Sequence, residues 1–188
     1  VSKVRPQLVR QYGEFFWLDQ GEKDVQAYSR SVVMDVVKRY DVDGIHFDDY
    51  FYPYKAQDSS GKELEFPDDP SWKRFGAGGK LSRDDWRREN VNTFIQHVYK
   101  SIKGAKPWVK FGVSPFGIWR PKNPPQIVGL DAYSALYADS RKWLANGWVD
   151  YFAPQLYWAI DPPDQSFPVL LRWWAEQNTK GRILCPGL

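Results

Sequence analysis

The sequence predicts an α/β protein that forms part of a (β/α)8 TIM barrel. Short runs rich in β-branched and aromatic residues alternate with longer stretches of helical periodicity, a pattern typical of βα units around a parallel sheet. A complete eight-stranded barrel usually needs about 250 residues, whereas this chain has 188. We therefore expect residues 1–188 to form one domain that is a fragment of a larger barrel.

Five runs are predicted as strands because they are short and rich in β-forming residues. A weaker run from Glu14 to Asp19 precedes four stronger ones. The stronger runs are Asp43 to Asp49, Val109 to Ser114, Val149 to Tyr157 and Arg182 to Pro186.

Apolar residues at helical spacing predict four helices. The first covers about Asp24 to Tyr40, and the second follows the capping box that begins at Ser82. The third covers about Ala132 to Ala145 and the fourth about Pro168 to Thr179.

Two long connections, Tyr50 to Leu81 and Pro115 to Asp131, each follow a predicted strand. Loops after parallel strands lie at one end of the sheet, where α/β proteins place their sites. We expect both loops on that side, around one groove lined by aromatic residues.

The composition limits the classes of partner. The 26 Lys and Arg against 23 Asp and Glu leave a charge of +3, too small to indicate nucleic acid. No apolar run reaches the roughly 18 residues of a membrane-spanning helix, and the single cysteine, Cys185, excludes an internal disulfide. Aromatic residues make up 17% of the chain, which suits either sugar binding or the packing of helices on a sheet.

The segment Asp43-Gly44-Ile45-His46-Phe47-Asp48-Asp49 is the most informative. Alternate strand side chains face opposite sides, so Ile45 and Phe47 should face the helices, with His46 and Asp48 toward the barrel axis. A carboxylate at the end of a strand followed by aromatic rings, here Tyr50 and Tyr52, is what glycosidic cleavage requires. Alternatively, Asp48 or Asp49 caps a turn or pairs with His46, and a metal site is disfavoured because adjacent ligands converge poorly.

The run from Asp43 to Tyr54, together with three other segments, resembles the glycosyl hydrolase-like family 10 domain. The others are Trp17 to Gly21, Tyr137 to Trp143 and Val149 to Trp158. The resemblance implies a bacterial (β/α)8 barrel, extracellular or in the cell envelope, with some members acting on peptidoglycan glycan strands. It also implies that this chain holds roughly strands four to seven with their helices. We expect no cofactor and no metal.

The spacing from Asp43 to Asp48 also resembles the fourth-strand motif of the α-amylase superfamily, where the last Asp is the nucleophile. His46 stands where that superfamily has Arg. A retaining glycosidase needs a second carboxyl group about 5 to 5.5 Å away, and an inverting one about 6.5 to 9.5 Å. The candidates are Asp49, Asp19 and Asp161, or an acid on a missing segment.

Further residues are candidates for substrate binding. Gln155 and Tyr157 should point into the barrel mouth, although Gln155 could equally satisfy buried backbone groups. Trp119, Arg120 and Trp158 follow strands directly and could form a stacking platform with a cation, although Arg120 could also be a solvated loop residue. His46, Tyr50 and Tyr52 complete the candidate set.

The sequence thus predicts a glycoside hydrolase acting on a bacterial cell-wall, peptidoglycan-like or related polysaccharide. One alternative is a catalytically silent barrel that only binds carbohydrate, since no second acid is evident. Another is a metal-dependent polysaccharide deacetylase.

Overall fold

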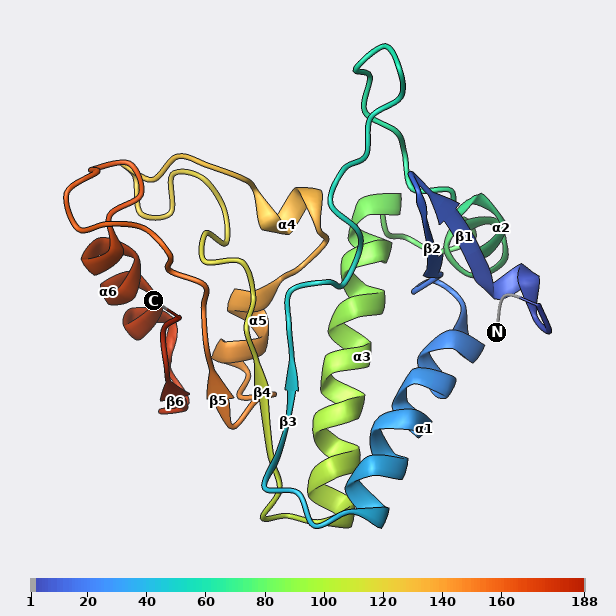
Figure 1. The fold of residues 1–188 in the computed structure, drawn as a ribbon, viewed down its shortest axis with the longest axis horizontal. Coiled ribbons are helices and arrows are strands. Elements are labelled where there is room, and N and C mark those ends of the chain that lie inside the picture. The colour runs from blue at the N-terminus through green and yellow to red at the C-terminus, as the bar shows by residue number, and fades with distance from the viewer. Residues whose placement is uncertain (1–2, 188) are drawn as a thin grey trace.

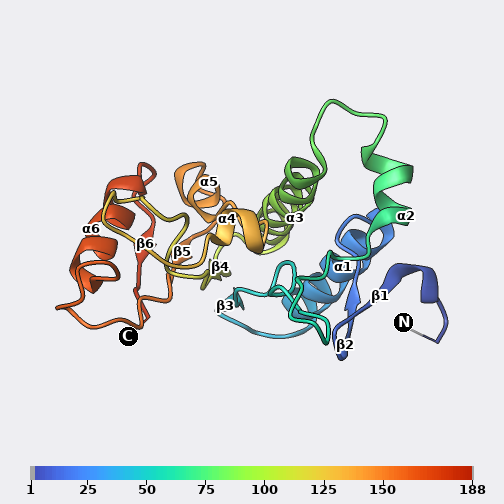
Figure 2. The same ribbon diagram turned by 90° about the horizontal axis from the view of Figure 1, so that it is seen from above.

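The computed structural model describes residues 3–187 and contains a four-stranded parallel sheet. Its strands, in spatial order, are β3 (Gly44–Phe47), β4 (Lys110–Val113), β5 (Tyr151–Phe152) and β6 (Ile183–Leu184). This confirms the predicted α/β architecture. Within residues 3–187 the sheet is open, as Figure 2 shows from above, so the structure is compatible with part of a barrel and does not show a complete one.

The strand predicted over Val149 to Tyr157 is much shorter than expected. Only Tyr151 and Phe152 form ladder pairs with both neighbours, and Pro154, which has no N–H, lies just beyond them. Pairing resumes at Gln155 through isolated bridges to Phe116 and Gly187. The register is therefore maintained up to the carboxyl end of the sheet.

Three predicted helices are confirmed within a few residues: α1 (Lys23–Arg39), α3 (Arg83–Ala105) and α6 (Phe167–Gln177). Ser82 caps α3, since its hydroxyl oxygen accepts a bond from the Asp85 amide at 3.1 Å. In Figure 1, α1 and α3 lie beside each other on the β3 side of the molecule.

The prediction of one helix over Ala132 to Ala145 is wrong, because two short helices replace it: α4 (Ala132–Ala135) and α5 (Ser140–Ala145). Tyr137 lies between them with φ of 53°, a left-handed conformation that interrupts a helix. Its buried hydroxyl accepts a bond from Arg87 at 2.6 Å. This tertiary contact accounts for a break that local periodicity does not reveal.

The weak strand predicted at Glu14 to Asp19 exists as β2 (Phe15–Leu18), but it does not belong to the parallel sheet. It pairs antiparallel with β1 (Val9–Tyr12), after the short turn of helix η1 (Pro6–Leu8). Gly13, at φ of 58°, makes the connection. This hairpin lies beside the loop after β3, because Tyr12 Oη donates to Leu64 O and accepts from Ala56 N.

Both long loops lie at the carboxyl end of the parallel strands, as predicted (Figure 1). The first contains two short helical turns, α2 (Asp69–Ser71) and η2 (Trp72–Gly76). Buried ion pairs fix this loop to α3: Asp68, which is fully buried, accepts bonds from Arg87 at 2.7 and 2.8 Å and also pairs with Arg83.

The core lies between the sheet and its helices. Phe111 and Val113 of β4 are fully buried, and Phe47 of β3 stacks on Phe94 of α3 with ring centroids 6.0 Å apart. Phe152 of β5 packs on Trp174 of α6 at 4.9 Å. Helices therefore cover one face of the sheet, and the polar side chains described below occupy the other.

Residues 1–188 studied alone should self-associate. Within the described residues β3 and β6 are edge strands, and Tyr28 and Val32 of α1 remain about half exposed beside β3. Unpaired edges flanked by apolar side chains favour pairing with another chain. Light scattering checks this, and a monodisperse monomer that melts cooperatively above about 60 °C would contradict it.

Arg87→Met should destabilise the protein by about 3 to 5 kcal/mol, since it leaves the buried Asp68 carboxylate short of a partner. Burial raises the pKa of Asp68, but the bonds from Arg87 and Arg83 outweigh it and hold the pKa below the ordinary 3.8. This stabilisation is present above about pH 4 and is lost as pH falls through the lowered pKa. Urea denaturation at several pH values measures it. The matched control Arg39→Met, at an exposed ion pair, should change stability by less than about 0.5 kcal/mol.

Candidate functional site

The candidate site centres on Asp48, which follows β3 at the carboxyl end of the sheet. Its side chain is exposed, and Oδ1 accepts hydrogen bonds from the Asp49 amide and from Gln155 Nε2, both at 2.9 Å. Gln155 Nε2 also donates to Ser114 O at 2.9 Å. Three neighbouring strand ends therefore orient this carboxylate, and within residues 3–187 its Oδ2 accepts no bond.

Asp49 points in a different direction from Asp48. Asp49 is 5% exposed, and its carboxylate accepts a hydrogen bond from the Tyr54 hydroxyl. Burial raises the pKa of Asp49, and the bond from Tyr54 opposes part of that rise. Asp49 thus fixes the first turn of the loop after β3.

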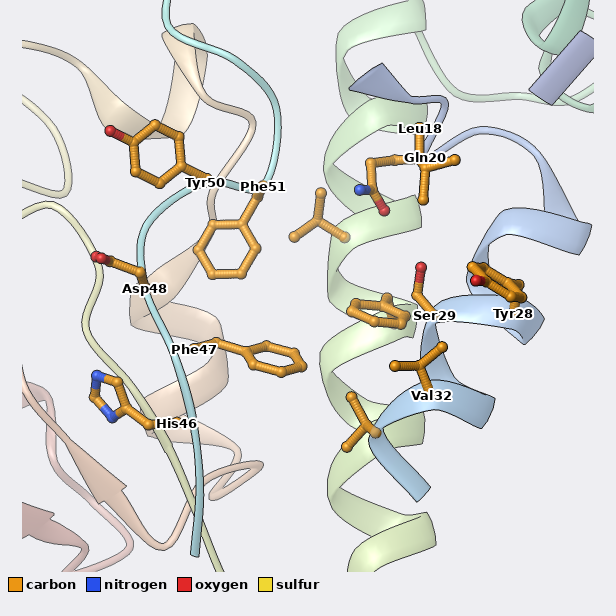
Figure 3. A pocket seen from close by; sticks show the side chains of 13 residues that line it. Leu18, Gln20, Tyr28, Ser29, Val32, His46, Phe47, Asp48, Tyr50 and Phe51 are labelled. Carbon is orange, nitrogen blue, oxygen red and sulfur yellow. The ribbon is translucent and has the colours of Figure 1, made fainter. Parts of the chain in front are cut away.

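A second polar layer lies beneath Asp48 on the same face. His46 Nδ1 is 2.9 Å from the Tyr151 hydroxyl, and the two rings stack with centroids 5.6 Å apart. The predicted alternation along β3 is correct: Figure 3 shows His46 and Asp48 on one side of the strand and Phe47 on the other.

A groove of about 510 Å³ lies between β3 and α1 and includes Asp48 and His46 in its lining. In Figure 3, Gln20 lies at the upper end of the groove and Ser29 near its middle, whereas the side chains of Asp48 and His46 point from β3 to the side away from α1. Tyr50, which is 62% exposed, lines the same groove and stacks on Trp17 of β2 at 6.3 Å. No residue of the second long loop lines this groove, contrary to the expectation of one groove between both loops.

Asp19 does not occupy the groove as a second carboxylate. Its neighbours Leu18 and Gln20 line the groove, but Asp19 itself is fully buried. It pairs with Arg10 at 2.8 Å and accepts a bond from Ser71 at 2.8 Å. These contacts give Asp19 a structural role in joining the hairpin to the first loop. Asp161, the third candidate, is exposed on the loop after β5.

Tyr52 is also buried, at 1% exposure, where its ring contacts Phe66 and Tyr137 edge to face. A sugar at the surface cannot reach it in this structure. The prediction that it binds substrate therefore conflicts with its position in the core.

The predicted stacking platform of Trp119, Arg120 and Trp158 is divided between two places. Trp119 and Arg120 line a separate hollow beside α5 and the end of α6. There the Trp119 ring stacks on Trp173 with centroids 5.9 Å apart, and the Arg141 guanidinium is 5.1 Å from its centroid. The indole thus has the contacts of a packing residue.

Trp158 and Tyr157 line another hollow, after β5. Tyr157 is 64% exposed and lies over Gly187, at the far side of the sheet from Tyr50. Both rings remain candidates for binding, on a part of the rim that Asp48 does not share.

Three residues near Asp48 were not predicted as site residues: Tyr151, Trp17 and Tyr54. Tyr151 could have been found, because it alternates with Ala153, Gln155 and Tyr157 on the same strand. Trp17 reaches the site from the hairpin, and the signal that could have found it is the segment Trp17 to Gly21, one of those that carry the family resemblance.

Among residues 3–187, no three His, Cys, Asp or Glu side chains come together in a way that could hold a metal ion. Nor does any helix of this part of the chain combine the length and apolarity needed to cross a membrane.

Tyr54→Phe should raise the pKa of Asp49 further above its ordinary value of 3.8, since it removes a bond that favours the carboxylate. The variant should lose roughly 1 to 3 kcal/mol of stability at neutral pH and less at about pH 3, where the carboxyl group is protonated. Carboxyl-carbon NMR titration and denaturation at the two pH values test this. The exposed Tyr40 provides the control Tyr40→Phe, and an unchanged Asp49 titration would refute the assignment.

Comparison with known proteins identifies the family. The model of the family described as Glycosyl hydrolase-like 10 matches residues 3–185. Glycosyl hydrolase YngK of Bacillus subtilis is 39% identical over 181 residues, which cover 94% of this chain and 34% of that protein. Glycosyl hydrolase DigH of Escherichia coli K12 is 41% identical over 172 residues, covering 89% and 38%.

The chain thus spans 34 to 38% of the length of these relatives. The family match covers all the segments on which the resemblance was based, including Asp43 to Asp49. The resemblance is therefore confirmed, and it supports a glycoside-hydrolase-like function. The chain belongs to the glycosyl hydrolase-like 10 family.

Proposed function

We propose that the protein is a glycosidase that cleaves a bacterial cell-wall, peptidoglycan-like polysaccharide, with Asp48 as nucleophile or charge stabiliser. The observation that carries this proposal is the Asp48 carboxylate, exposed at the carboxyl end of β3 and oriented through Oδ1 by two hydrogen bonds. Such a carboxylate can attack, or stabilise, the oxocarbenium-like centre that forms when a glycosidic bond breaks.

The surroundings of Asp48 suit a sugar. Tyr50 offers an exposed ring beside the carboxylate, on the side of β3 to which Asp48 points, and Gln155 brings an amide to Asp48 itself. Flat rings bind pyranose faces while polar groups bind hydroxyls. The relatives are bacterial proteins named glycosyl hydrolases, which supports a glycan as substrate. We also propose an extracellular or cell-envelope location, which rests on the family resemblance alone.

Cleavage of a glycosidic bond also requires a second carboxyl group, which acts as general acid. Asp49 faces Tyr54 and Asp19 faces Arg10, so neither is directed toward a bond held at Asp48. We propose that the general acid is either Asp161, exposed on the loop after β5, or an acid outside residues 1–188. The same observation favours the second candidate function, a barrel that binds a glycan without cleaving it.

Asp48→Asn in the intact protein should abolish hydrolysis of purified cell-wall glycan and leave glycan binding nearly intact. An amide keeps the shape of the side chain but cannot attack or balance a positive centre, so turnover should fall at least about a thousandfold, equivalent to roughly 4 kcal/mol. Released reducing ends measure turnover, and pull-down with insoluble glycan measures binding.

Asp41→Asn is the matched control, since Asp41 is an exposed acid before the amino end of β3. It should keep full activity. Turnover by Asp48→Asn within about tenfold of wild type would contradict the role of Asp48. Binding without turnover by the wild-type protein would support the silent barrel instead.

A further inference from the structure

The second polar layer joins strands that are not neighbours. His46 belongs to β3 and Tyr151 to β5, and β4 runs between them. Even so, the His46 Nδ1 to Tyr151 Oη distance is 2.9 Å and the two rings are within 15° of parallel. The phenol ring must therefore lie flat across β4.

Gly112 makes this crossing possible. It pairs with His46 on one side and with Tyr151 on the other, so it lies directly under the phenol ring. A Cβ atom at position 112 would be 1.9 Å from the nearest ring carbon. Any other residue would displace the ring, so the three residues form one unit.

The hydrogen bond has a preferred direction. Burial raises the pKa of Tyr151, so its hydroxyl carries a proton at neutral pH. Among the described residues, His46 is the hydrogen-bond partner of the Tyr151 hydroxyl. The hydroxyl therefore donates a hydrogen bond to His46 Nδ1. A neutral imidazole has one acceptor nitrogen and one N–H. If Nδ1 accepts, Nε2 carries the proton.

We propose that Tyr151 is a positioning residue that holds His46 in the Nε2–H form, so that His46 donates a hydrogen bond to a hydroxyl oxygen of the sugar bound at Asp48. His46 and Asp48 are two residues apart on one strand face, about 7 Å along the chain, a span that one sugar ring covers. No bond forms or breaks at His46. The role of His46 toward the sugar rests on the proposed function, whereas its tautomer does not.

Nitrogen NMR of the intact protein labelled with ¹⁵N-histidine tests the tautomer directly. The sequence has only two histidines, His46 and His97, so a His97→Gln variant assigns the spectrum. For the neutral imidazole, we expect the proton of His46 on Nε2 in the wild type and a mixture of the two tautomers in Tyr151→Phe. A predominant Nδ1–H form, or the same mixture in both proteins, would overturn the proposal.

Enzyme kinetics test whether Tyr151 acts through His46. We expect Tyr151→Phe to lower kcat/KM about five- to tenfold, and to have little further effect in a His46→Gln background, because Tyr151 acts through His46. Equal losses in both backgrounds would overturn the proposal. Gly112→Ala should reproduce the NMR change by displacing the ring, and Tyr40→Phe, remote and exposed, should change nothing.

The NMR and kinetic experiments distinguish failure of the His46 proposal from failure of the proposed function. If the wild-type protein hydrolyses no cell-wall glycan, the proposed function is wrong, and pull-down of glycan by the His46→Gln variant then replaces kinetics. Unweakened binding by that variant would refute the donor role of His46. The NMR experiment decides the tautomer in either case.

Discussion

The pleat of β3 and its register with β4 and β5 are the constraint on which the site depends. Side chains alternate across a strand, so a slip of one residue would move Asp48 into the helix-facing core and expose Phe47. The stacking of Phe47 on Phe94 and the burial of Phe111 and Val113 oppose that slip. Apolar packing on one face of the sheet thus determines which polar groups occupy the other.

The rim above the sheet is held by a different means, because it contains little regular structure. Asp68 and Asp19 are fully buried carboxylates that each bind an arginine, Arg87 and Arg10. A buried ion pair contributes little net stability compared with apolar packing. Its bonds are directional, however, so these pairs specify one arrangement of the hairpin and first loop around Asp48.

Sequence patterns predicted the parts of the molecule that local geometry determines. The alternation along β3 placed His46 and Asp48 on one face, and the Ser82 cap located the start of α3. The failures involve distant partners: Tyr137 breaks a helix to reach Arg87, and Trp119 turns toward Trp173. The helix break at Tyr137 and the orientation of Trp119 depend on partners that are far away in the sequence. A pattern among neighbouring residues therefore cannot predict them.

The bonding of Gln155 determines what the site offers to a ligand. Both donor positions of its amide nitrogen are used, on Asp48 Oδ1 and Ser114 O, which leaves its carbonyl oxygen as an acceptor. Asp48 Oδ2 is an acceptor as well. Two acceptors at this level match the hydroxyl donors of a sugar, but each sugar oxygen can also accept a bond. The Gln155 and Asp48 oxygens alone would give the sugar oxygens no hydrogen-bond donor. The N–H group proposed for His46, in the layer beneath, would supply that donor.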